Sequence, residues 1–213
     1  MLCVSLGKAT LAECLKALKQ YDLCELRLDR LKLKDAELKK VFSSSKNTIA
    51  AFRASGKITE PERLKKLKAA IDMGADYVDI DVDTTDFFKH TVSNYAAKKK
   101  CKVIASYHND EKTPLKGELE HIVEWCKGCS PDVIKVACRS RSDKDNARLL
   151  GLLDCDFKMI VIGMGAKGKI TRIFAPQLGA FCTYVAFSEK TKTAPGQMTK
   201  KELERFLDGV NYV

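Results

Sequence analysis

PERLKKLKAAIDMGADYVDIDVD, the sequence of residues 61–83, holds one copy of the pattern that decides the fold. Its first part predicts an amphipathic helix from Pro61 to Gly74, whose lysines suit a solvated outer face. Its second part predicts a strand from Tyr77 to Asp83 in which apolar and charged residues alternate, so that Asp79 and Asp81 share one face. The pattern therefore indicates a helix outside a sheet and an ionic face inside it.

The same alternation of strands and helices runs along the whole chain. Eight strands are predicted, at Leu2–Leu6, Leu23–Asp29, Thr48–Ala54, Tyr77–Asp83, Lys102–His108, Val133–Cys138, Met159–Gly163 and Thr183–Phe187. Helices are predicted at Leu11–Gln20, Pro61–Gly74, Phe87–Lys99, Leu115–Cys126, Asn146–Leu153 and Lys200–Leu207. Eight βα units predict an α/β fold, a single-domain (β/α)8 TIM barrel over residues 1–213, with an open doubly wound sheet as the alternative.

Charged side chains recur at every second position of several strands. If the helices cover the apolar outer face, the charged residues point into the barrel. An unpaired buried charge costs several kcal/mol, so these residues must pair with one another, at the wet C-terminal mouth of the barrel. One alternative is that the charges form a purely structural ion-pair network. Another is an antiparallel sheet with one face in water, but the helices between successive strands disfavour it, because hairpins need only short turns. The inward set is Glu25, Arg27, Asp29, Arg53, Asp79, Asp81, His108 and Lys135.

Composition bounds the class of protein. Hydrophobic residues at 45% and charged residues at 31% are typical of a globular domain and exclude a disordered chain. The sequence has no apolar run of about 18 residues and no signal-peptide pattern, so a cytoplasmic protein without a membrane partner is expected. Its nine cysteines lack paired spacing and are expected to be mostly buried thiols.

The net charge of +10 raises the question of nucleic-acid binding. The 29 lysines are spread along helices without interleaved aromatic residues or an arginine-rich arm, which is typical of a solvated surface. The summed positive field suits an anionic small-molecule substrate better. We therefore expect a small-molecule substrate and no nucleic acid.

Two residues carry the candidate chemistry. Lys135 lies in an apolar strand with β-branched neighbours, and with arginines on other strands nearby it is expected to be a buried amine that is neutral part of the time. Such an amine attacks carbonyl groups to form an imine. His108 ends a predicted strand, where barrel enzymes keep general acids and bases. His90 and His121 lie in helical segments and are expected at the surface.

Two short motifs point to cofactors but have simpler explanations. Residues 163–168 fit GxGxxG, with Glu189 at the distance expected for a dinucleotide site. A dinucleotide fingerprint normally opens its fold, whereas this one follows six βα units and better suits an anion site, with Arg172 beside it for a carboxylate or phosphate. Cys126 and Cys129 form a CxxC without a second pair. Neither a cofactor nor a metal is therefore predicted.

Seven blocks of residues occur in an order that one enzyme family shares. They are Glu25–Asp29, Phe52–Arg53, Asp79–Asp81, Ser106–His108, Ile134–Ala137, Met164–Arg172 and Ala194–Gln197. Together they resemble the type I 3-dehydroquinate dehydratases of the shikimate pathway, and the resemblance covers nearly the whole chain. It implies a lyase that is a (β/α)8 barrel, is usually a homodimer, and works without metal or organic cofactor.

The resemblance also implies residue roles. Lys135 would form a Schiff base with the C3 ketone of 3-dehydroquinate, and His108 would move the proton from C2 to the departing C1 hydroxyl. Substrate-binding roles are implied for Glu25, Arg27, Arg53, Arg172, Thr193 and Gln197, with Arg172 on the substrate carboxylate. A class I Schiff-base aldolase and a catalytically silent binding protein stay open as alternatives.

The chain departs from the family pattern at three places. The N-terminal strand pair that usually precedes the first barrel strand is missing, which leaves the barrel floor less covered. The family's Glu-Gly-Gly loop, whose glutamate helps to orient the histidine, is replaced by a shorter loop at residues 54–60, so His108 has no assigned carboxylate partner. Thr193 replaces the common serine and keeps its hydroxyl.

Overall fold

A computed structural model describes residues 1–44, 47–54, 56, 58–194 and 196–207 of the chain. The predicted single domain of residues 1–213 therefore extends past the described part at its C-terminal end. The shorter loop predicted at residues 54–60 also lies partly outside it, at residues 55 and 57.

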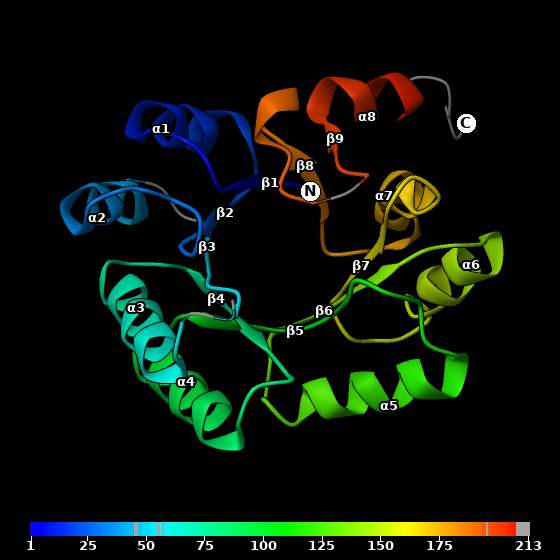
Figure 1. The fold of residues 1–213 in the computed structure, drawn as a ribbon, viewed down its shortest axis with the longest axis horizontal. Helices are drawn as coiled ribbons and strands as arrows, with labels where there is room; N and C mark the ends of the chain where they lie inside the picture. The colour runs from blue at the N-terminus through cyan, green and yellow to red at the C-terminus, as the bar shows by residue number, and fades with distance from the viewer. Residues whose placement is uncertain (45–46, 55, 57, 195, 208–213) are drawn as a thin grey trace.

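The strands form one parallel sheet that curls around a central axis (Figure 1). Their order is β7-β6-β5-β4-β3-β2-β1-β8-β9, and all pairs are parallel. Within the described residues, β7 and β8 are not paired as strands of the sheet. They are joined where the Phe181 N–H, just before β8, donates to the Met159 carbonyl of β7 at 2.8 Å. The predicted TIM barrel is confirmed, and an open doubly wound sheet is wrong. The strands are β1 (Leu2–Leu6), β2 (Leu23–Arg27), β3 (Thr48–Ala51), β4 (Tyr77–Asp81), β5 (Lys102–Asn109), β6 (Val133–Arg139), β7 (Met159–Met164), β8 (Thr183–Ala186) and β9 (Met198–Thr199).

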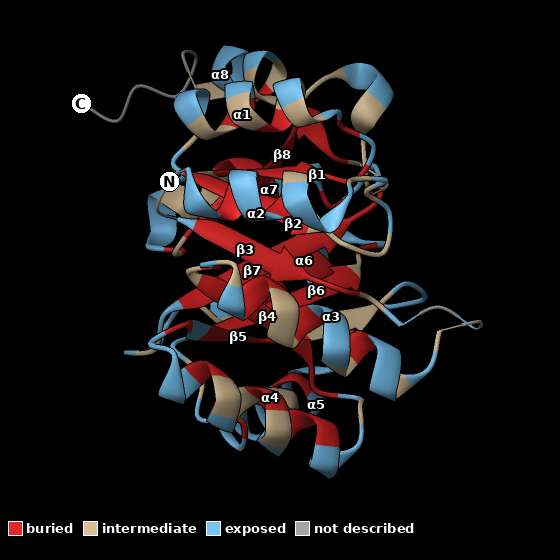
Figure 2. Cartoon of the chain, turned by 90° about the vertical axis from the view of Figure 1, so that its left-hand side faces the viewer, coloured by how far each residue is buried: buried red, intermediate tan, exposed pale blue. Residues whose placement is uncertain are grey.

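Helices surround the strands and present their exposed faces outward (Figure 2). They are α1 (Leu11–Gln20), α2 (Asp35–Ser43), α3 (Glu60–Asp72), α4 (Asp86–Lys98), α5 (Lys116–Lys127), α6 (Asp143–Gly151), α7 (Lys169–Phe174) and α8 (Lys200–Leu207), with short 3₁₀ turns at Ala175–Leu178 and Glu189–Thr191. Two helices, α2 and α7, were not predicted. The first has a readable apolar face in Leu38, Val41 and Phe42, whereas the second has only six residues.

Local signals set where several elements begin and end. The Thr10 hydroxyl accepts the Glu13 N–H at 3.3 Å while the Glu13 carboxylate accepts the Thr10 N–H at 2.8 Å, a capping box that starts α1. Strands β2, β3 and β4 end two or three residues earlier than predicted. The chain leaves the sheet there to form the loops of the barrel mouth, which carry Asp29 and Arg53.

The barrel interior is sorted by depth along the strands. Leu23, Ile49, Tyr77, Ile104 and Ile160 form an apolar floor near the N-terminal ends of their strands. Because side chains alternate, the next inward position on each strand lies one layer higher, and on β2, β4 and β5 it holds the polar residues Glu25, Asp79 and Ser106. A second apolar layer packs between the outer faces of the strands and the helices.

Two further expectations can be compared with the structure. Eight of the nine cysteines are buried and Cys155 is exposed, which confirms that most are buried thiols. Within the described ranges, no helix combines the length and the apolar composition needed to cross a bilayer.

Candidate active site

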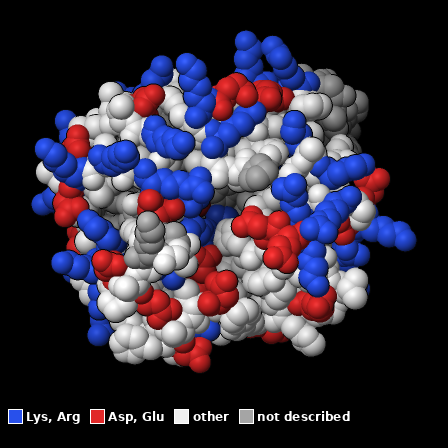
Figure 3. Space-filling view, in the orientation of Figure 1, with Lys and Arg blue, Asp and Glu red and all other residues white. Residues whose placement is uncertain are grey.

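A cavity of about 720 Å³ opens at the C-terminal ends of the strands. The face drawn in Figure 3 is hollowed at its centre, with acidic and basic side chains beside the hollow. All eight site residues predicted from the sequence line this cavity, and they come from the strands β2, β5 and β6, the helix α7 and the loops that follow β3 and β8. They are Glu25, Arg27, Arg53, His108, Lys135, Arg172, Thr193 and Gln197.

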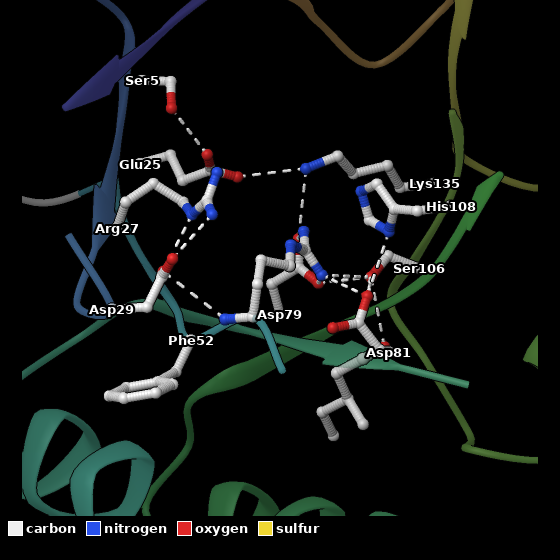
Figure 4. Close-up of polar contacts among 12 residues, drawn as sticks. Ser5, Glu25, Arg27, Asp29, Phe52, Asp79, Asp81, Ser106, His108 and Lys135 are labelled. Carbon is white, nitrogen blue, oxygen red and sulfur yellow. Dashed lines mark hydrogen bonds and ion pairs between the residues drawn. The ribbon is translucent and has the colours of Figure 1, made fainter. Parts of the chain in front are cut away.

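Lys135 points into the barrel interior, where its amine contacts Glu25 and Asp79 (Figure 4). Its Nζ is 3.0 Å from Glu25 Oε2, 3.2 Å from Asp79 Oδ2 and 4.2 Å from the centroid of the Tyr184 ring. The arginine expected nearby is Arg53, whose Nη2 contacts the same Asp79 oxygen at 2.6 Å. The direct contacts of the amine are two carboxylates and an aromatic face, which balance the charge of its ammonium form.

The two carboxylates beside Lys135 are held in their ionised forms. Burial by itself would raise the pKa of Glu25, but Lys135 and Arg53 outweigh it and lower the pKa to about 2. The pKa of Asp79 also lies well below its usual range, because Arg53 and Lys135 outweigh its desolvation. The Ser5 hydroxyl donates to Glu25 Oε1 at 2.8 Å and so fixes the second oxygen of that carboxylate.

Arg53 joins the carboxylates of β4 at the mouth. Its Nη2 is 2.6 Å from Asp79 Oδ2, and its Nη1 is 2.5 Å from Asp81 Oδ1 and 2.9 Å from Ser106 Oγ. Burial favours loss of the guanidinium proton, but Asp79 and Asp81 reverse this and raise the pKa of Arg53. Because its donors are already engaged, the contacts of Arg53 are those of a group that orders the site.

His108 has a carboxylate partner that the sequence analysis left unassigned. Its Nδ1 lies 3.0 Å from Asp81 Oδ1 (Figure 4). The pKa of Asp81 is lowered to about 2, because Arg53 and His108 outweigh its desolvation. An ionised carboxylate only accepts hydrogen bonds, so Nδ1 carries the proton and the lone pair of Nε2 stays available. Burial, with help from Arg53, lowers the pKa of His108 and favours the neutral imidazole.

Arg172 is a buried cation of a different kind. It lies in α7 and is 1% exposed, and its Nη1 donates to the Tyr184 carbonyl at 3.2 Å. Its Nε has no hydrogen-bond partner, and no carboxylate within the described residues pairs with it. Burial lowers its pKa to about 10. A desolvated guanidinium that lines a cavity without a counter-ion is suited to bind an anionic group.

The remaining predicted residues form the rim. Arg27 donates from Nε and Nη2 to the two oxygens of Asp29, at 2.9 and 2.7 Å. The Thr193 N–H and hydroxyl donate to Gln197 Oε1, at 2.7 and 3.1 Å. Gln197 thereby holds the loop that follows β8, of which residue 195 lies outside the described part of the chain.

The two cofactor-like motifs have packing explanations. A Cβ on Gly168 would lie 2.2 Å from the Gly163 carbonyl oxygen, so glycine at these positions allows β7 and α7 to meet backbone to backbone. Cys126 and Cys129 are both buried, and burial raises the pKa of Cys126 to about 12. Its thiol therefore stays protonated, which disfavours metal binding and redox chemistry.

The sequence analysis missed several members of the site. Ser5, Ser106 and Tyr184 line or support the ionic cluster but were assigned no role. Sheet register supplies the missing signal for the serines, because Ser5 pairs with Glu25 and Ser106 pairs with Lys135. Tyr184 lies in an apolar strand, where an aromatic residue is more often part of the core.

Comparison with known proteins agrees with this geometry. The family model described as type I 3-dehydroquinase matches residues 2–211. A 3-dehydroquinate dehydratase of Methanocaldococcus jannaschii is 32% identical over 220 residues, which cover 98% of this chain and 99% of the relative. A 3-dehydroquinate dehydratase of Coxiella burnetii is 34% identical over 219 residues, covering 96% of this chain and 91% of the relative.

Solved structures show the same fold. The 3-dehydroquinate dehydratase of Geobacillus kaustophilus superposes with a TM-score of 0.85 at 21% identity, covering 97% of this chain and 89% of that chain. The type I 3-dehydroquinate dehydratase of Clostridium difficile, solved with covalently modified comenic acid, gives a TM-score of 0.83 at 26% identity, covering 97% and 90%. The resemblance stated from sequence is therefore confirmed.

Proposed function

The chain belongs to the type I 3-dehydroquinase family and is a hydro-lyase, and from this premise we propose that it converts 3-dehydroquinate to 3-dehydroshikimate through an imine on Lys135, with His108 as general acid and base. The observation that carries the proposal is the placement of three groups around one cavity. These are the buried amine of Lys135, the Asp81-anchored imidazole of His108 and the unpaired guanidinium of Arg172.

The first step forms the imine. The Lys135 ammonium loses a proton to water in the open cavity, and the neutral amine attacks the C3 ketone of the substrate. The carbinolamine then loses water to give a protonated imine. The positive imine nitrogen withdraws electrons from C2 and acidifies the hydrogens there. The relative from Clostridium difficile was solved with covalently modified comenic acid, which supports a covalent step here.

The second step is the elimination. Nε2 of His108 removes a proton from C2, and the electron pair forms an enamine. The enamine electrons re-form the imine as the C1–O bond breaks, and His108 returns its proton to the departing hydroxyl, which leaves as water. Hydrolysis of the imine then releases 3-dehydroshikimate and restores the amine. One histidine serves both transfers because Asp81 holds its other nitrogen throughout.

Binding completes the proposal. The substrate carboxylate pairs with Arg172, which supplies the counter-ion that this guanidinium lacks among the described residues. Arg27, Thr193 and Gln197 lie at the rim, where they hold ring hydroxyls. Glu25 and Arg53 order the cluster around the amine.

Borohydride trapping tests the proposal. Incubation with 3-dehydroquinate and borohydride, followed by digestion and mass spectrometry, should place the reduced adduct on the peptide that contains Lys135. The His108→Ala variant should form the same adduct without turnover, because carbonyl attack and proton removal are separate tasks. Adducts spread over surface lysines, or dehydration without any adduct, would contradict the role of Lys135. Adducts and turnover with an aldol substrate alone would identify an aldolase instead, and a protein that forms no adduct and shows no turnover would be a binding protein.

A further inference from the structure

Arg63 is a buried cation that the proposed reaction does not use. It belongs to the first turn of α3, on the outer layer of the barrel, yet the residue is only 3% exposed. Its Nε donates to the Phe52 carbonyl at 3.2 Å, at the end of the β3 segment. Its Cζ lies 4.7 Å from the centroid of the Phe88 ring in α4. The guanidinium therefore passes inward between two helices and reaches the edge of the active site.

At that edge Arg63 meets the carboxylate that holds His108. Its Nη2 is 3.6 Å from Asp81 Oδ2, in a pair whose side chains are 3% and 10% exposed. Oδ1 of Asp81 is shared by Arg53 at 2.5 Å, His108 at 3.0 Å and Ser106 at 3.2 Å. Among the described residues, Oδ2 has Arg63 as its charged contact. Oδ1 is thus held by hydrogen bonds from the barrel interior, and Oδ2 by an ion-pair contact from the outer layer.

We propose that Arg63 is a positioning residue for His108, acting through Oδ2 of Asp81. A carboxylate held at one oxygen can rotate about its terminal torsion, because that torsion has a broad energy profile. Holding the second oxygen fixes the plane of the carboxylate, and with it the acceptor for the Nδ1 proton of His108. Fixing that acceptor keeps Nε2 unprotonated and directed at the cavity. The consequence for turnover rests on the proposed function, but the effect on the imidazole does not.

The anchoring of α3 supports this role. The Thr85 N–H and hydroxyl donate to the Glu60 carboxylate, at 3.0 and 2.6 Å, so the start of α3 is tied to the start of α4. Arg63 lies three residues after Glu60, in the same turn of α3, so its backbone has a fixed position. A guanidinium fixed at its base, at Nε and over an aromatic ring has little freedom to leave Asp81.

The chain contains a matched control in Lys89. This residue lies in the first turn of α4, is 7% exposed, donates from Nζ to the Val82 carbonyl at 3.2 Å and lies 5.2 Å from the Trp125 ring centroid. Its carboxylate contact is Asp86, on its own helix, at 2.8 Å. Lys89 therefore resembles Arg63 in its burial, its backbone-carbonyl contact and its aromatic neighbour, but its carboxylate partner lies outside the active-site cluster.

The experiment compares Arg63→Met with Lys89→Met in two readouts. Nitrogen chemical shifts of histidine-labelled protein without substrate report which nitrogen of His108 carries the proton, and the chain has only three histidines to assign. Arg63→Met should populate the Nε2–H tautomer and lower kcat about tenfold through misorientation, with KM nearly unchanged. Lys89→Met should change neither. Arg63→Lys, which keeps the charge, should fall between Arg63→Met and the wild type.

Two results would overturn the assignment. One is a His108 tautomer that Arg63→Met leaves unchanged, and the other is an equal loss of kcat in the Lys89 control, which would make both residues purely structural. If Arg63→Met does not fold, Arg63→Gln decides by the same readouts, because it removes the charge and keeps a donor for Phe52. A wild-type protein that fails to dehydrate 3-dehydroquinate would overturn the proposed function, while the tautomer comparison would still decide the role of Arg63.

Discussion

The two sides of the cavity differ in how their charges are balanced. On the paired side, built by β2 to β6, Lys135 lies against Glu25 and Asp79, and Arg53 lies against Asp79. On the open side, built by β7, α7 and β8, Arg172 contacts a backbone carbonyl and, within the described residues, no carboxylate. The paired side is complete before substrate arrives, whereas the open side takes its counter-ion from the substrate in the proposed reaction.

The largest expected effect follows from removing the central cation of the paired side. Lys135→Met should lower kcat by ~10⁴-fold or more, because the covalent route is lost. It should also lower the free energy of unfolding by about 3–5 kcal/mol, because Glu25 and Asp79 lose a buried counter-charge. Steady-state kinetics and urea unfolding measure the two effects, with Lys89→Met as the buried-lysine control. More than a hundredth of the wild-type kcat would remove Lys135 from the mechanism.

Substitution of Arg53 on the paired side and of Arg172 on the open side should affect stability differently. Arg53→Met should lower the free energy of unfolding by about 3–5 kcal/mol, since Asp79 and Asp81 then lose the buried cation that they share. Arg172→Met should leave that free energy unchanged or raise it, because an unpaired buried charge is removed. The same variant should raise KM by roughly tenfold or more and alter kcat little. Equal losses of stability in the two variants would erase the distinction between the sides.

His108 tests whether proton transfer belongs to the paired side. His108→Ala should lower kcat at least ~10²-fold, the usual minimum for general acid–base catalysis. Imine formation should continue, because the amine and its carboxylates are untouched. Single-turnover trapping with borohydride separates the two steps. Loss of both imine and turnover would show that His108 also acts in carbonyl attack.

The pH profile of kcat/KM refines this assignment. The base form of His108 is the neutral one, and burial together with Arg53 lowers its pKa, so the acid limb of the profile should lie below pH ~6.5. The hydrogen bond to Asp81 opposes this shift, so Asp81→Asn should move the limb to still lower pH while reducing kcat. A wild-type limb above neutral pH would mean that another group titrates.

The alternation of side chains along each strand was enough to predict which residues point inward. It was not enough to predict which of them pair with one another. The spacing of Glu25, Asp79 and Lys135 along their own strands placed each on the inner face. The pairing of charges depends on the register between neighbouring strands, and the sequence of one strand does not show that register. Asp81 pairs in register with Ser106, two residues before His108, and only this stagger makes Asp81 the histidine's partner.

For the helices, the pattern predicted the position of the element but not the direction of every side chain on it. The pattern of residues 61–74 predicted an outer helix with solvated lysines, and α3 confirms that helix. Arg63 lies in the same helix and turns inward, which depends on Phe52, Phe88 and Asp81 arriving from other elements. The homodimer and the cytoplasmic location expected from the sequence stay predictions.

Substitution of Tyr184 should have the smallest effect on activity and stability. It also separates the contribution of the aromatic ring from that of the hydroxyl. The ring faces Lys135 at 4.2 Å, while the buried hydroxyl finds no hydrogen-bond partner in the described part of the chain and burial raises its pKa well above the usual range. Tyr184→Phe keeps the ring and removes a protonated donor that lacks an acceptor.

This variant should therefore keep kcat and KM and change the free energy of unfolding by no more than about 0.5 kcal/mol, or raise it, since an unsatisfied buried polar group is itself a cost. Tyr184→Leu also removes the aromatic face beside the nitrogen that becomes the cationic imine, and should slow imine trapping by roughly twofold to fivefold, the equivalent of about 0.5–1 kcal/mol of cation–π interaction. Tyr95 supplies the control, because its hydroxyl donates to Asp72 at 2.8 Å and Tyr95→Phe loses that bond. A Tyr184→Phe variant as impaired as Tyr184→Leu would give the hydroxyl a role in proton transfer and would place a titrating group on the open side of the cavity.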